Sequence, residues 1–439
     1  MFFMKNILIT GAGIGGLAVG ALLAKDGYNV TIYTQNDPVE SAYDWEDSNS
    51  TRLVEELTGV VLDETQKGFL ADNRYYSPSE KTPIETSFGG NPPEKMERKL
   101  LARLLTDYAK ENGVQFVLHT KIASAVTDNA RVTGIRTEDG LVFTADLVID
   151  ACGVDSPVRK SLPDVCGIEQ TYADGEVFYA YRGIYEKADD IPPDPHAYEL
   201  YLMHRGEPGM SWFITEENST DILLGRFRPF GQEKVDAEWE KFKKNHPQLG
   251  KNLLRGGTFG KIPVRRPLAK MVCDGYAAIG DSAYMTYPMS GCGIDISIRA
   301  AKLLHECILA DTDGAFSTQT LWKYNYDYIC RHAHLPGVDI LKNMLLNLKP
   351  EKLDLLFDKR IADAEDLSSG GANTGAKEML GKVARGIFHL PTLLKTAKAA
   401  LSGGRVAKVY KQIPAVYSEA DFRSWKRKVD KTVIPLKNP

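Results

Sequence analysis

The order of apolar and polar positions divides the chain into segments with different expected structures. Near the start, an apolar run at 7–10 precedes a stretch with helical spacing of apolar side chains at 17–24, and a second apolar run follows at 28–33. This order predicts a strand, a helix and a strand in one β-α-β unit. Stretches that begin at residues 145 and 275 each predict a further strand that ends in a glycine turn.

The middle of the chain is rich in aromatic residues and has short runs separated by turn residues. These runs predict antiparallel strands of one sheet. They cover 177–185, 198–203, 210–215 and 221–227. Trp239 and Phe242 then stand three positions apart among charged residues, which predicts an amphipathic helix at 236–245.

From residue 311 onward the patterns are helical. Three short helices are expected near the end of the chain, at 376–386, 392–401 and 404–412. Basic residues are frequent in the last of these and in the tail that follows, with Tyr410 and Trp425 between them. A solvated basic face is the simplest interpretation, and contact with an anionic membrane surface is the functional one.

Composition narrows the classes of function. Of the 439 residues, 43% are apolar and 26% are charged, and the net charge of −4 gives no general reason to expect a nucleic-acid partner. No apolar run approaches about 18 residues, so no membrane-spanning helix is expected. Six cysteines without a Cys-x-x-Cys pair favour a reducing, cytoplasmic compartment. The first strand begins too early for a cleaved signal peptide.

A glycine-rich turn follows the first predicted strand directly. Gly11, Gly13 and Gly16 have the spacing Gly-x-Gly-x-x-Gly. Gly11 permits the tight turn, Gly13 lets the backbone approach a pyrophosphate, and Gly16 lets the helix pack closely on the strand. An acidic residue is expected to contact the ribose at the end of the second strand. Thr34 and Gln35 stand there instead, and Gln35 is still able to hydrogen-bond a ribose.

Two further turns complete the pattern. In 145–159, an apolar strand leads to Cys152-Gly153 and then to Ser156 and Arg159. In 275–294, a strand leads to Gly280-Asp281 and to a glycine-rich loop before a predicted helix.

Together, the three elements resemble the FAD-dependent oxidoreductases with the p-hydroxybenzoate hydroxylase fold. That superfamily also contains the geranylgeranyl reductases and the flavin halogenases, and the resemblance covers about residues 5–310. It implies an α/β fold, α+β overall, with a Rossmann-like FAD-binding domain, an antiparallel β-sheet substrate domain and a helical C-terminal region. The FAD-binding domain is expected at 1–70, 95–160 and 256–310, the substrate domain at 71–94 and 161–255, and the helical region at 311–439.

The resemblance also implies roles for individual residues toward FAD. Asp281 is expected to accept a hydrogen bond from a ribityl hydroxyl, and Arg98 is expected to approach the phosphates. Gly153 belongs to the second cofactor turn. The loop 288–293, with Gly291 and Gly293, is expected to pack on the isoalloxazine. Backbone N–H groups at Gly293 and Ile294 would stabilise negative charge on the reduced ring.

The second turn bears on the electron donor. The hydroxylases carry an Asp-Gly pair where this chain has Cys152-Gly153, and the form Asp150-Ala-Cys-Gly is more similar to the reductases and halogenases. The donor therefore stays open between NAD(P)H and a ferredoxin-like protein.

The substrate strands also resemble those of the geranylgeranyl reductases. Of that family's Tyr-x-Trp-x-Phe-Pro and Gly-x-Gly patterns, Trp212 and the first glycine, Gly225, are kept. Alternation along a strand puts Met210, Trp212 and Ile214 on one face, and Tyr179 and Tyr181 likewise share a face. These five side chains are the predicted lining of an apolar cavity.

The resemblance implies reduction of carbon–carbon double bonds in an apolar, isoprenoid-like or polycyclic substrate by hydride from flavin N5. Solvent, Tyr287 or Cys292 would supply the proton for the second carbon. A hydroxylase that uses NAD(P)H and O₂ is the first alternative, and a flavin halogenase or a flavin-binding protein without turnover are the others. The scattered histidines predict no metal site.

Overall fold

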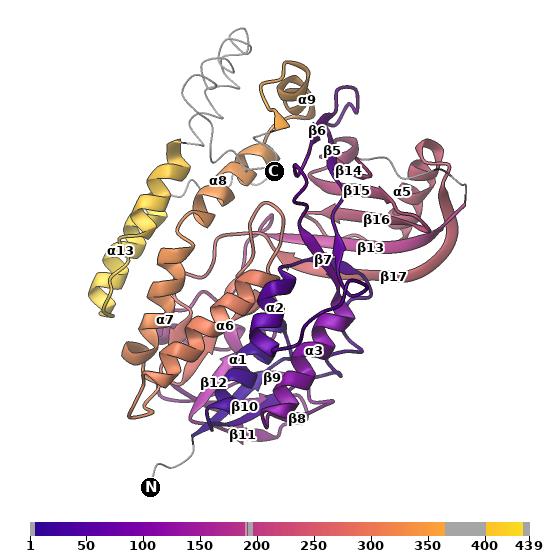
Figure 1. The fold of residues 1–439 in the computed structure, drawn as a ribbon. Coiled ribbons are helices and arrows are strands. Elements are labelled where there is room, and N and C mark those ends of the chain that lie inside the picture. The colour runs from indigo at the N-terminus through magenta and orange to yellow at the C-terminus, as the bar shows by residue number, and fades with distance from the viewer. Residues whose placement is uncertain (1–4, 189–190, 192–195, 365–400, 433–439) are drawn as a thin grey trace.

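Two large sheets organise the molecule (Figure 1). The computed structural model describes residues 5–188, 191, 196–364 and 401–432. The predicted helix at 376–386 and residues 392–400 of the predicted helix at 392–401 therefore lie outside the described residues, whereas residues 401–410 are helical. Among the described residues, no helix has both the length and the apolar character needed to cross a membrane.

The first sheet has six strands in the order β18-β19-β12-β1-β2-β8. Neighbours are parallel except for β18 and β19. The strands are β1 Asn6–Thr10, β2 Asn29–Tyr33, β8 Gln115–Val117, β12 Leu147–Asp150, β18 Val272–Cys273 and β19 Tyr276–Ala278. Parallel strands need crossovers, and α1 (Ile14–Lys25) provides the one between β1 and β2. The sequence-based β-α-β unit is thus confirmed.

Helices pack around this sheet because its central strands are buried on both faces. α1 packs against α3 (Arg98–Glu111) and α6 (Ile294–Leu309), and α7 (Thr318–Arg331) packs against α6 and β18. Trp322, Tyr324 and Tyr328 of α7 are fully buried in this core. α7 therefore belongs to the packing of the first sheet, although the sequence assigned it to a separate helical region.

Two small sheets flank the first. One has the order β11-β10-β9, and the other has the order β3-β7-β4. Their strands are β9 Ile122–Asp128, β10 Arg131–Thr137, β11 Val142–Thr144, β3 Glu46–Ser48, β4 Gly68–Phe69 and β7 Glu94–Glu97.

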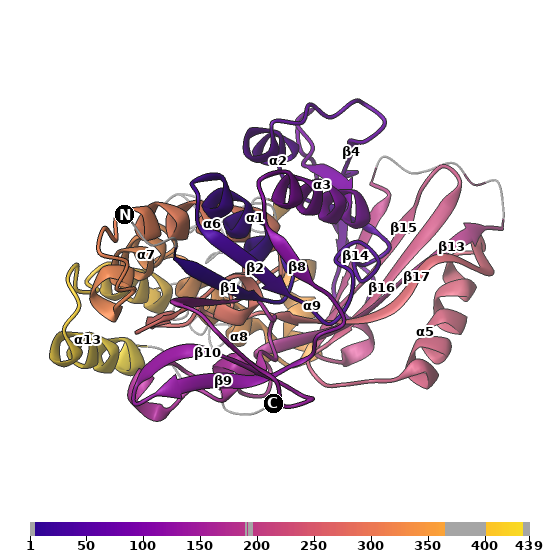
Figure 2. The same ribbon diagram turned by 90° about the horizontal axis from the view of Figure 1, so that it is seen from below.

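The second large sheet has seven strands in the order β17-β13-β16-β15-β14-β5-β6, and only β14 and β5 pair in parallel. The strands are β5 Asn73–Tyr76, β6 Ile84–Thr86, β13 Val177–Lys187, β14 Tyr198–Leu202, β15 Gly209–Thr215, β16 Ser219–Arg226 and β17 Leu249–Pro263. The predicted antiparallel strands are confirmed. Figure 2 shows α5 (Gln232–Asn245) on the outer side of this sheet, away from β1 and β2.

One domain boundary needs correction. The sequence placed residues 256–263 in the first domain, but they are the second half of β17 and pair with β13 of the second sheet. The glycines at 256, 257 and 260 look like a loop in the sequence. Gly256 and Gly257 have φ values of 75° and 70°, and the register shifts beside them, so these glycines belong to an irregularity within one long strand.

The remaining helices close the molecule. They are α2 Thr51–Thr58, α4 Pro157–Lys160, α8 Leu335–Leu346, α9 Pro350–Asp358, α13 Glu419–Thr432 and three 3-10 turns at Asp164–Cys166, His204–Gly206 and Gly280–Ala283. Figure 1 shows α8 and α9 leading from α7 toward β5 and β6. There, Ser77 donates a hydrogen bond to Asp354 and Thr82 donates one to Asp358.

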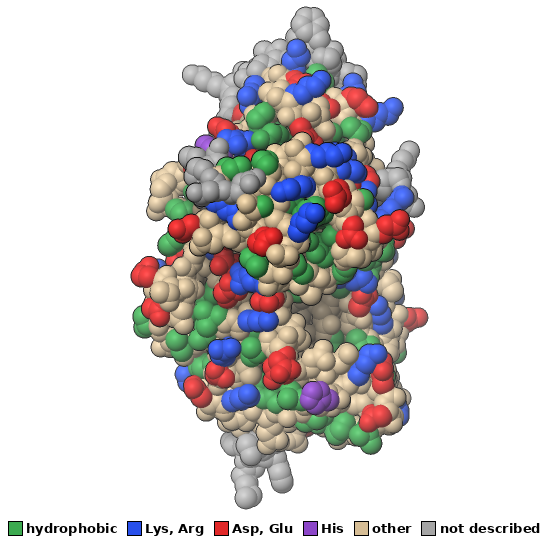
Figure 3. Space-filling model, turned by 90° about the vertical axis from the view of Figure 1, so that its right-hand side faces the viewer, with side chains coloured by type: hydrophobic (Ala, Val, Ile, Leu, Met, Phe, Trp, Pro, Cys, Tyr) green, Lys and Arg blue, Asp and Glu red, His purple; other side chains and the backbone are tan. Residues whose placement is uncertain are grey.

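The basic tail presents charged residues outward and apolar residues inward. Tyr410, Phe422, Trp425 and Val429 are buried in the core of the first sheet. These four apolar side chains are therefore committed to the protein interior, and membrane contact stays a prediction that concerns the charged face alone. On another face, shown in Figure 3, basic and acidic side chains are interspersed.

The contact between α1 and β12 can be tested at Gly16. A Cβ atom at Gly16 would lie 2.7 Å from the Ala151 Cβ and 3.1 Å from the Gly11 carbonyl oxygen, so a larger side chain must displace backbone. We expect Gly16→Val to lower the free energy of unfolding by about 1–3 kcal/mol in urea titrations of FAD-free protein. Gly404→Val is the control, because a Cβ there meets nothing within 4 Å; equal losses in both variants would contradict the tight packing.

Candidate functional site

A cavity of about 1580 Å³ lies between the two large sheets. The carboxyl ends of β1, β12 and β19 meet at its rim, because parallel strands bring these ends to one edge of a sheet. The three turns singled out in the sequence follow these strand ends, so the first sheet brings them together. The opposite wall comes from the second sheet and from α8 and α9.

The first turn leaves the N-terminus of α1 open toward this cavity. Gly13 is the N-cap of α1, no side chain caps it, and the first turn holds no acidic residue. Gly13, Ile14 and Gly15 line the cavity. Gly11 has a φ of 80°, and a Cβ there would lie 2.6 Å from the Ala151 carbonyl oxygen, which explains the need for glycine. Open N–H groups at a helix N-terminus suit an anion such as a pyrophosphate.

The second and third turns are joined through the buried carboxylate of Asp150. It accepts hydrogen bonds from the Cys152 N–H at 3.0 Å, the Tyr276 hydroxyl at 2.8 Å and the Ser282 hydroxyl at 3.1 Å. Ser156, which caps α4, also donates to it. The polar residues of this motif thus hold the two turns in register, which leaves the Gly153 backbone facing the cavity.

Arg159 and Cys152 also belong to these two turns, and neither side chain lines the cavity. Arg159 is fully buried, donates to the carbonyl oxygens of Val154 and Ser282, and lies 4.6 Å from the centre of the Tyr284 ring. Burial, reinforced by the nearby Asp150 carboxylate, raises the pKa of the Cys152 thiol, which keeps it neutral.

Asp281 and Arg98 place opposite charges on the lining of the same cavity. Both line the cavity, and the described residues give the Asp281 carboxylate no hydrogen bond. Burial raises the pKa of Asp281 to about 6, although the positive charge of Arg98 opposes this rise. Asp281 therefore presents an acceptor to the cavity that lacks a partner. Arg98 lies 3.3 Å from Asp47 and is held at the first position of α3.

The loop 287–293 forms the next part of the wall and leads into α6. The Tyr287 N–H donates to the Cys292 carbonyl oxygen at 2.8 Å, so the loop closes on itself. Gly291 has a φ of 73°, and Gly293 is the N-cap of α6 without a side-chain cap. Like Gly13, Gly293 and Ile294 therefore present open backbone to the cavity.

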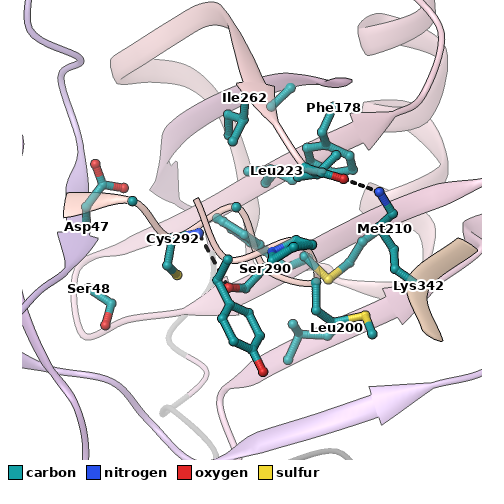
Figure 4. A pocket seen from close by; sticks show the side chains of 18 of the residues that line it. Asp47, Ser48, Phe178, Leu200, Met210, Leu223, Ile262, Ser290, Cys292 and Lys342 are labelled. Carbon is teal, nitrogen blue, oxygen red and sulfur yellow. Dashed lines mark hydrogen bonds between the residues drawn. The ribbon is translucent and has the colours of Figure 1, made fainter. Parts of the chain in front are cut away.

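Cys292 and Tyr287 both line the cavity, and Figure 4 shows Cys292 at the end where Asp47 lies. The Cys292 side chain is exposed, and it also lines a smaller pocket beside this cavity. Desolvation by the surrounding protein raises the pKa of its thiol and that of the Tyr287 phenol. Both groups are therefore protonated at neutral pH, as a proton donor must be.

The second sheet presents its concave face to the cavity. Met210, Trp212 and Ile214 of β15 line it as the alternation predicts, together with Leu200 and Leu202 of β14. A Cβ at Gly225 would overlap the Phe178 ring, so glycine at this position admits that ring to the cavity wall.

Two predicted lining residues need correction. Tyr179 and Tyr181 do not line the cavity; their neighbours Phe178, Ala180 and Arg182 do. Side chains alternate between the two faces of a strand, so an error of one position in β13 exchanges the residues assigned to the cavity face and to the outer face. Tyr181 packs instead into the cluster under α5, where its hydroxyl lies 2.9 Å from that of Tyr185. Tyr181 and Tyr185 are thus core residues of the outer face, whereas Tyr179 packs against the core of the first sheet.

Gln35 also lies away from the cavity. It follows β2 on an exposed stretch and is not among the lining residues, so its ribose contact stays a prediction. Gly11 and Gly16 shape the turn without lining the cavity.

Sequence reasoning missed two groups of lining residues. One comes from β3 and the segment that leads into it, and includes Tyr43, Trp45 and Asp47. The other comes from α8 and α9 and is largely apolar: Leu341, Lys342, Leu345, Leu353, Leu356 and Phe357. The apolar spacing of α8 and α9 was a usable signal for a buried face, but only the tertiary structure shows that this face meets a cavity. The described residues contain no group of three or more side chains suited to a metal ion.

Comparison with known proteins identifies the cofactor class. The family model described as FAD binding domain matches residues 4–332. This chain belongs to that FAD-binding family. It is a FAD-dependent oxidoreductase, and the proteins similar to it include digeranylgeranylglycerophospholipid reductases and a monooxygenase.

Individual relatives show how close the resemblance is. A digeranylgeranylglycerophospholipid reductase of Sulfolobus acidocaldarius is 26% identical over 73% of this chain and 74% of its own. A kynurenine 3-monooxygenase of Salinispora tropica is 24% identical over 71% and 74%. A geranylgeranyl bacteriochlorophyll reductase-like structure from Thermoplasma acidophilum has a TM-score of 0.71 at 19% identity and covers 92% of this chain and 99% of its own, which confirms the fold.

The residues of the cavity fit FAD. Two helix N-termini without side-chain caps, at Gly13 and Gly293, offer N–H groups, and the unpartnered Asp281 carboxylate offers an acceptor for hydroxyls. Arg98 supplies a positive charge at the same rim. This donor and acceptor set matches a molecule with phosphates, a polyhydroxyl chain and a ring that carries negative charge when reduced.

The raised pKa of Asp281 predicts a pH dependence of FAD binding. A hydroxyl that donates to Asp281 favours its ionised carboxylate. Without FAD, the Asp281 carboxyl is protonated below about pH 6. FAD affinity should therefore rise as the pH increases through about 6 and level off above it. Fluorescence titrations of FAD between pH 5 and pH 8 measure this change. Asp281→Asn should bind FAD with an affinity that no longer follows this titration; an unchanged profile in that variant would contradict the assignment.

Proposed function

We propose that this protein reduces carbon–carbon double bonds of an apolar, isoprenoid-like substrate. The observation that carries this proposal is the size and character of the cavity. At about 1580 Å³ it exceeds the roughly 300–1,000 Å³ of ordinary ligand pockets, so it has room for a second molecule besides FAD. When bound and reduced, FAD would supply the hydride for such a reduction.

The apolar end of the cavity supports a long hydrocarbon substrate. Leu345, Leu353, Leu356 and Phe357 of α8 and α9 line this end together with Leu200 and Leu202 of β14. Leu202 and Leu345 pack against the buried cluster that holds the three residues of α9. Burial of a hydrocarbon against such walls contributes about 0.8 kcal/mol for each CH₂ group removed from water. The names of several relatives, as digeranylgeranylglycerophospholipid reductases, agree with such a substrate class.

The chain's own side chains orient the substrate and supply a proton. Met210 and Trp212 form a flat apolar floor beside the loop 287–293. The Cys292 Sγ and the Tyr287 Oη hold protons at the same end, because the pKa values of both groups are raised. One of them protonates the carbon that does not receive hydride. We propose NAD(P)H or a ferredoxin-like protein as the electron donor.

Monooxygenation is the second candidate. It is favoured by the match to a kynurenine 3-monooxygenase and by the shared fold of a probable FAD-dependent monooxygenase from Pseudomonas aeruginosa, with a TM-score of 0.58 at 19% identity over 81% of this chain and 99% of that one. The apolar end of the cavity, lined by α8 and α9, favours reduction of a lipid over hydroxylation of a small aromatic molecule.

The two candidates give different products. We expect the FAD-loaded enzyme, reduced with dithionite under anaerobic conditions, to convert geranylgeraniol into a product that is heavier by two hydrogens, as detected by mass spectrometry. Cys292→Ala and Tyr287→Phe should show which group supplies the proton, because the one that acts loses turnover with its FAD affinity unchanged. A product heavier by one oxygen, formed with NAD(P)H in air, would establish the monooxygenase instead.

The apolar end can be tested by shortening it. Leu345 lines the apolar end, so Leu345→Trp should fill the space that the far end of a C20 isoprenoid occupies. We expect about a tenfold higher KM for geranylgeraniol and little change for the shorter geraniol. Leu309→Trp is the matched control, because Leu309 is 43% exposed at the end of α6 and does not line the cavity. Equal effects on both alcohols would contradict this placement of the chain.

A further inference from the structure

Two arginines and two aspartates form a continuous series of ion pairs beside the cavity, and all of them except the buried Asp221 line it. Arg98 lies 3.3 Å from Asp47, Asp47 lies 3.7 Å from Arg182, and Arg182 lies within 3.1 Å of Asp221 through two nitrogens. We call this series the charge ladder. It begins at the rim where the cofactor is expected and ends on β16 of the second sheet, so it connects the two large sheets.

The Arg182 end of the charge ladder is fixed by its surroundings. Arg182 is 8% exposed, and its guanidinium pairs with Asp221 and donates to the Glu46 carbonyl oxygen at 2.7 Å. It lies 5.6 Å from the ring centre of Trp45 and 5.1 Å from that of Trp212. A planar guanidinium held by a bidentate carboxylate and two aromatic faces has little freedom to move.

The Trp212 indole is held by the same group of residues. Its N–H lies 3.3 Å from the Asp221 carboxylate, so the ring that forms the substrate floor is anchored to the charge ladder.

The Arg98 end is held by fewer contacts. Among the described residues, the Arg98 guanidinium has Asp47 as its carboxylate partner, and that carboxylate also accepts from the Trp45 indole N–H at 3.3 Å. Removal of the Asp47 charge would leave Arg98 without this partner. The position of Arg98 therefore depends on Asp47, and that of Asp47 depends on the fixed Arg182.

We propose that Asp47 is a positioning residue that couples the substrate wall to FAD binding. It transmits the position of Arg182 to Arg98, so that a change at Arg182 alters FAD affinity through Asp47. Figure 4 shows Asp47 near Cys292, at the cofactor end of the cavity. This inference rests on FAD binding by the family and does not depend on the identity of the substrate.

A double-mutant cycle on FAD affinity tests the coupling. FAD is titrated into the cofactor-free protein and the dissociation constant is read from flavin fluorescence. We expect Arg182→Lys, which keeps the charge but loses the bidentate geometry, to weaken FAD binding about fivefold in the natural background. In the Asp47→Asn background the same change should alter FAD affinity less than twofold.

A control and a second cycle make the outcome decisive. Asp44→Asn is the matched control, because Asp44 pairs with Lys99 at 3.4 Å and does not line the cavity. The Arg182→Lys effect should persist in that background.

If Asp47→Asn does not fold, as judged by circular dichroism, Arg98→Gln replaces it, since the coupling passes through Arg98 as well. The same factor for Arg182→Lys in all backgrounds, or no effect of Arg182→Lys in any, would overturn the proposal. Neither result would bear on the reduction of an isoprenoid, which the product assay measures separately.

Discussion

The buried carboxylate of Asp150 is the interaction on which the geometry of the site depends. It gathers donors from its own turn, from the neighbouring strand β19 and from the turn after that strand. A buried carboxylate is costly unless several donors satisfy it, so the surrounding groups have little choice of arrangement. The result is that the turns after β12 and β19 are held together at one rim, where the Gly153 backbone lines the cavity. The cofactor site is thus formed by backbone, and side chains hold the backbone in place.

The cavity depends on a second constraint, which is the meeting of two sheets with different connectivity. The parallel sheet ends at the rim, and the antiparallel sheet supplies a continuous wall of alternating side chains. Its inner face is apolar at Met210 and Leu200 but carries Arg182 and Asp221 where it approaches the first sheet. Polar groups therefore concentrate where FAD is expected, and apolar groups concentrate toward α8 and α9. This gradient is what allows one cavity to accept both a charged cofactor and a hydrocarbon chain.

The C-terminal helices have a larger part in the site than their sequence indicates. α7 completes the core of the first sheet, and α8 and α9 close the apolar end of the cavity against Leu202 and Met203. Lys342 illustrates the difficulty: it is 4% exposed, pairs with Asp339 and donates to the Val264 carbonyl oxygen. In a sequence, a lysine on a helix indicates a solvated face. Here the Asp339 carboxylate and the Val264 carbonyl oxygen provide the partners that a buried ammonium group needs.

The sequence by itself determined the parts of this protein that depend on local chemistry. Glycine spacing after a short apolar strand requires a turn with close backbone approach, and this is a property of a few consecutive residues, so the turn at Gly11, Gly13 and Gly16 could be predicted directly. The role of the loop before α6 was predicted from the family resemblance. The parity of β15 was also readable, because Met210, Trp212 and Ile214 alternate with other residues. Tertiary structure alone decided which face of β13 meets the cavity, because aromatic residues suit a core on either side of a sheet. It alone brought together Asp47, Arg98 and Arg182, which stand far apart in the chain, since ion pairs between distant segments leave no periodic trace in a sequence.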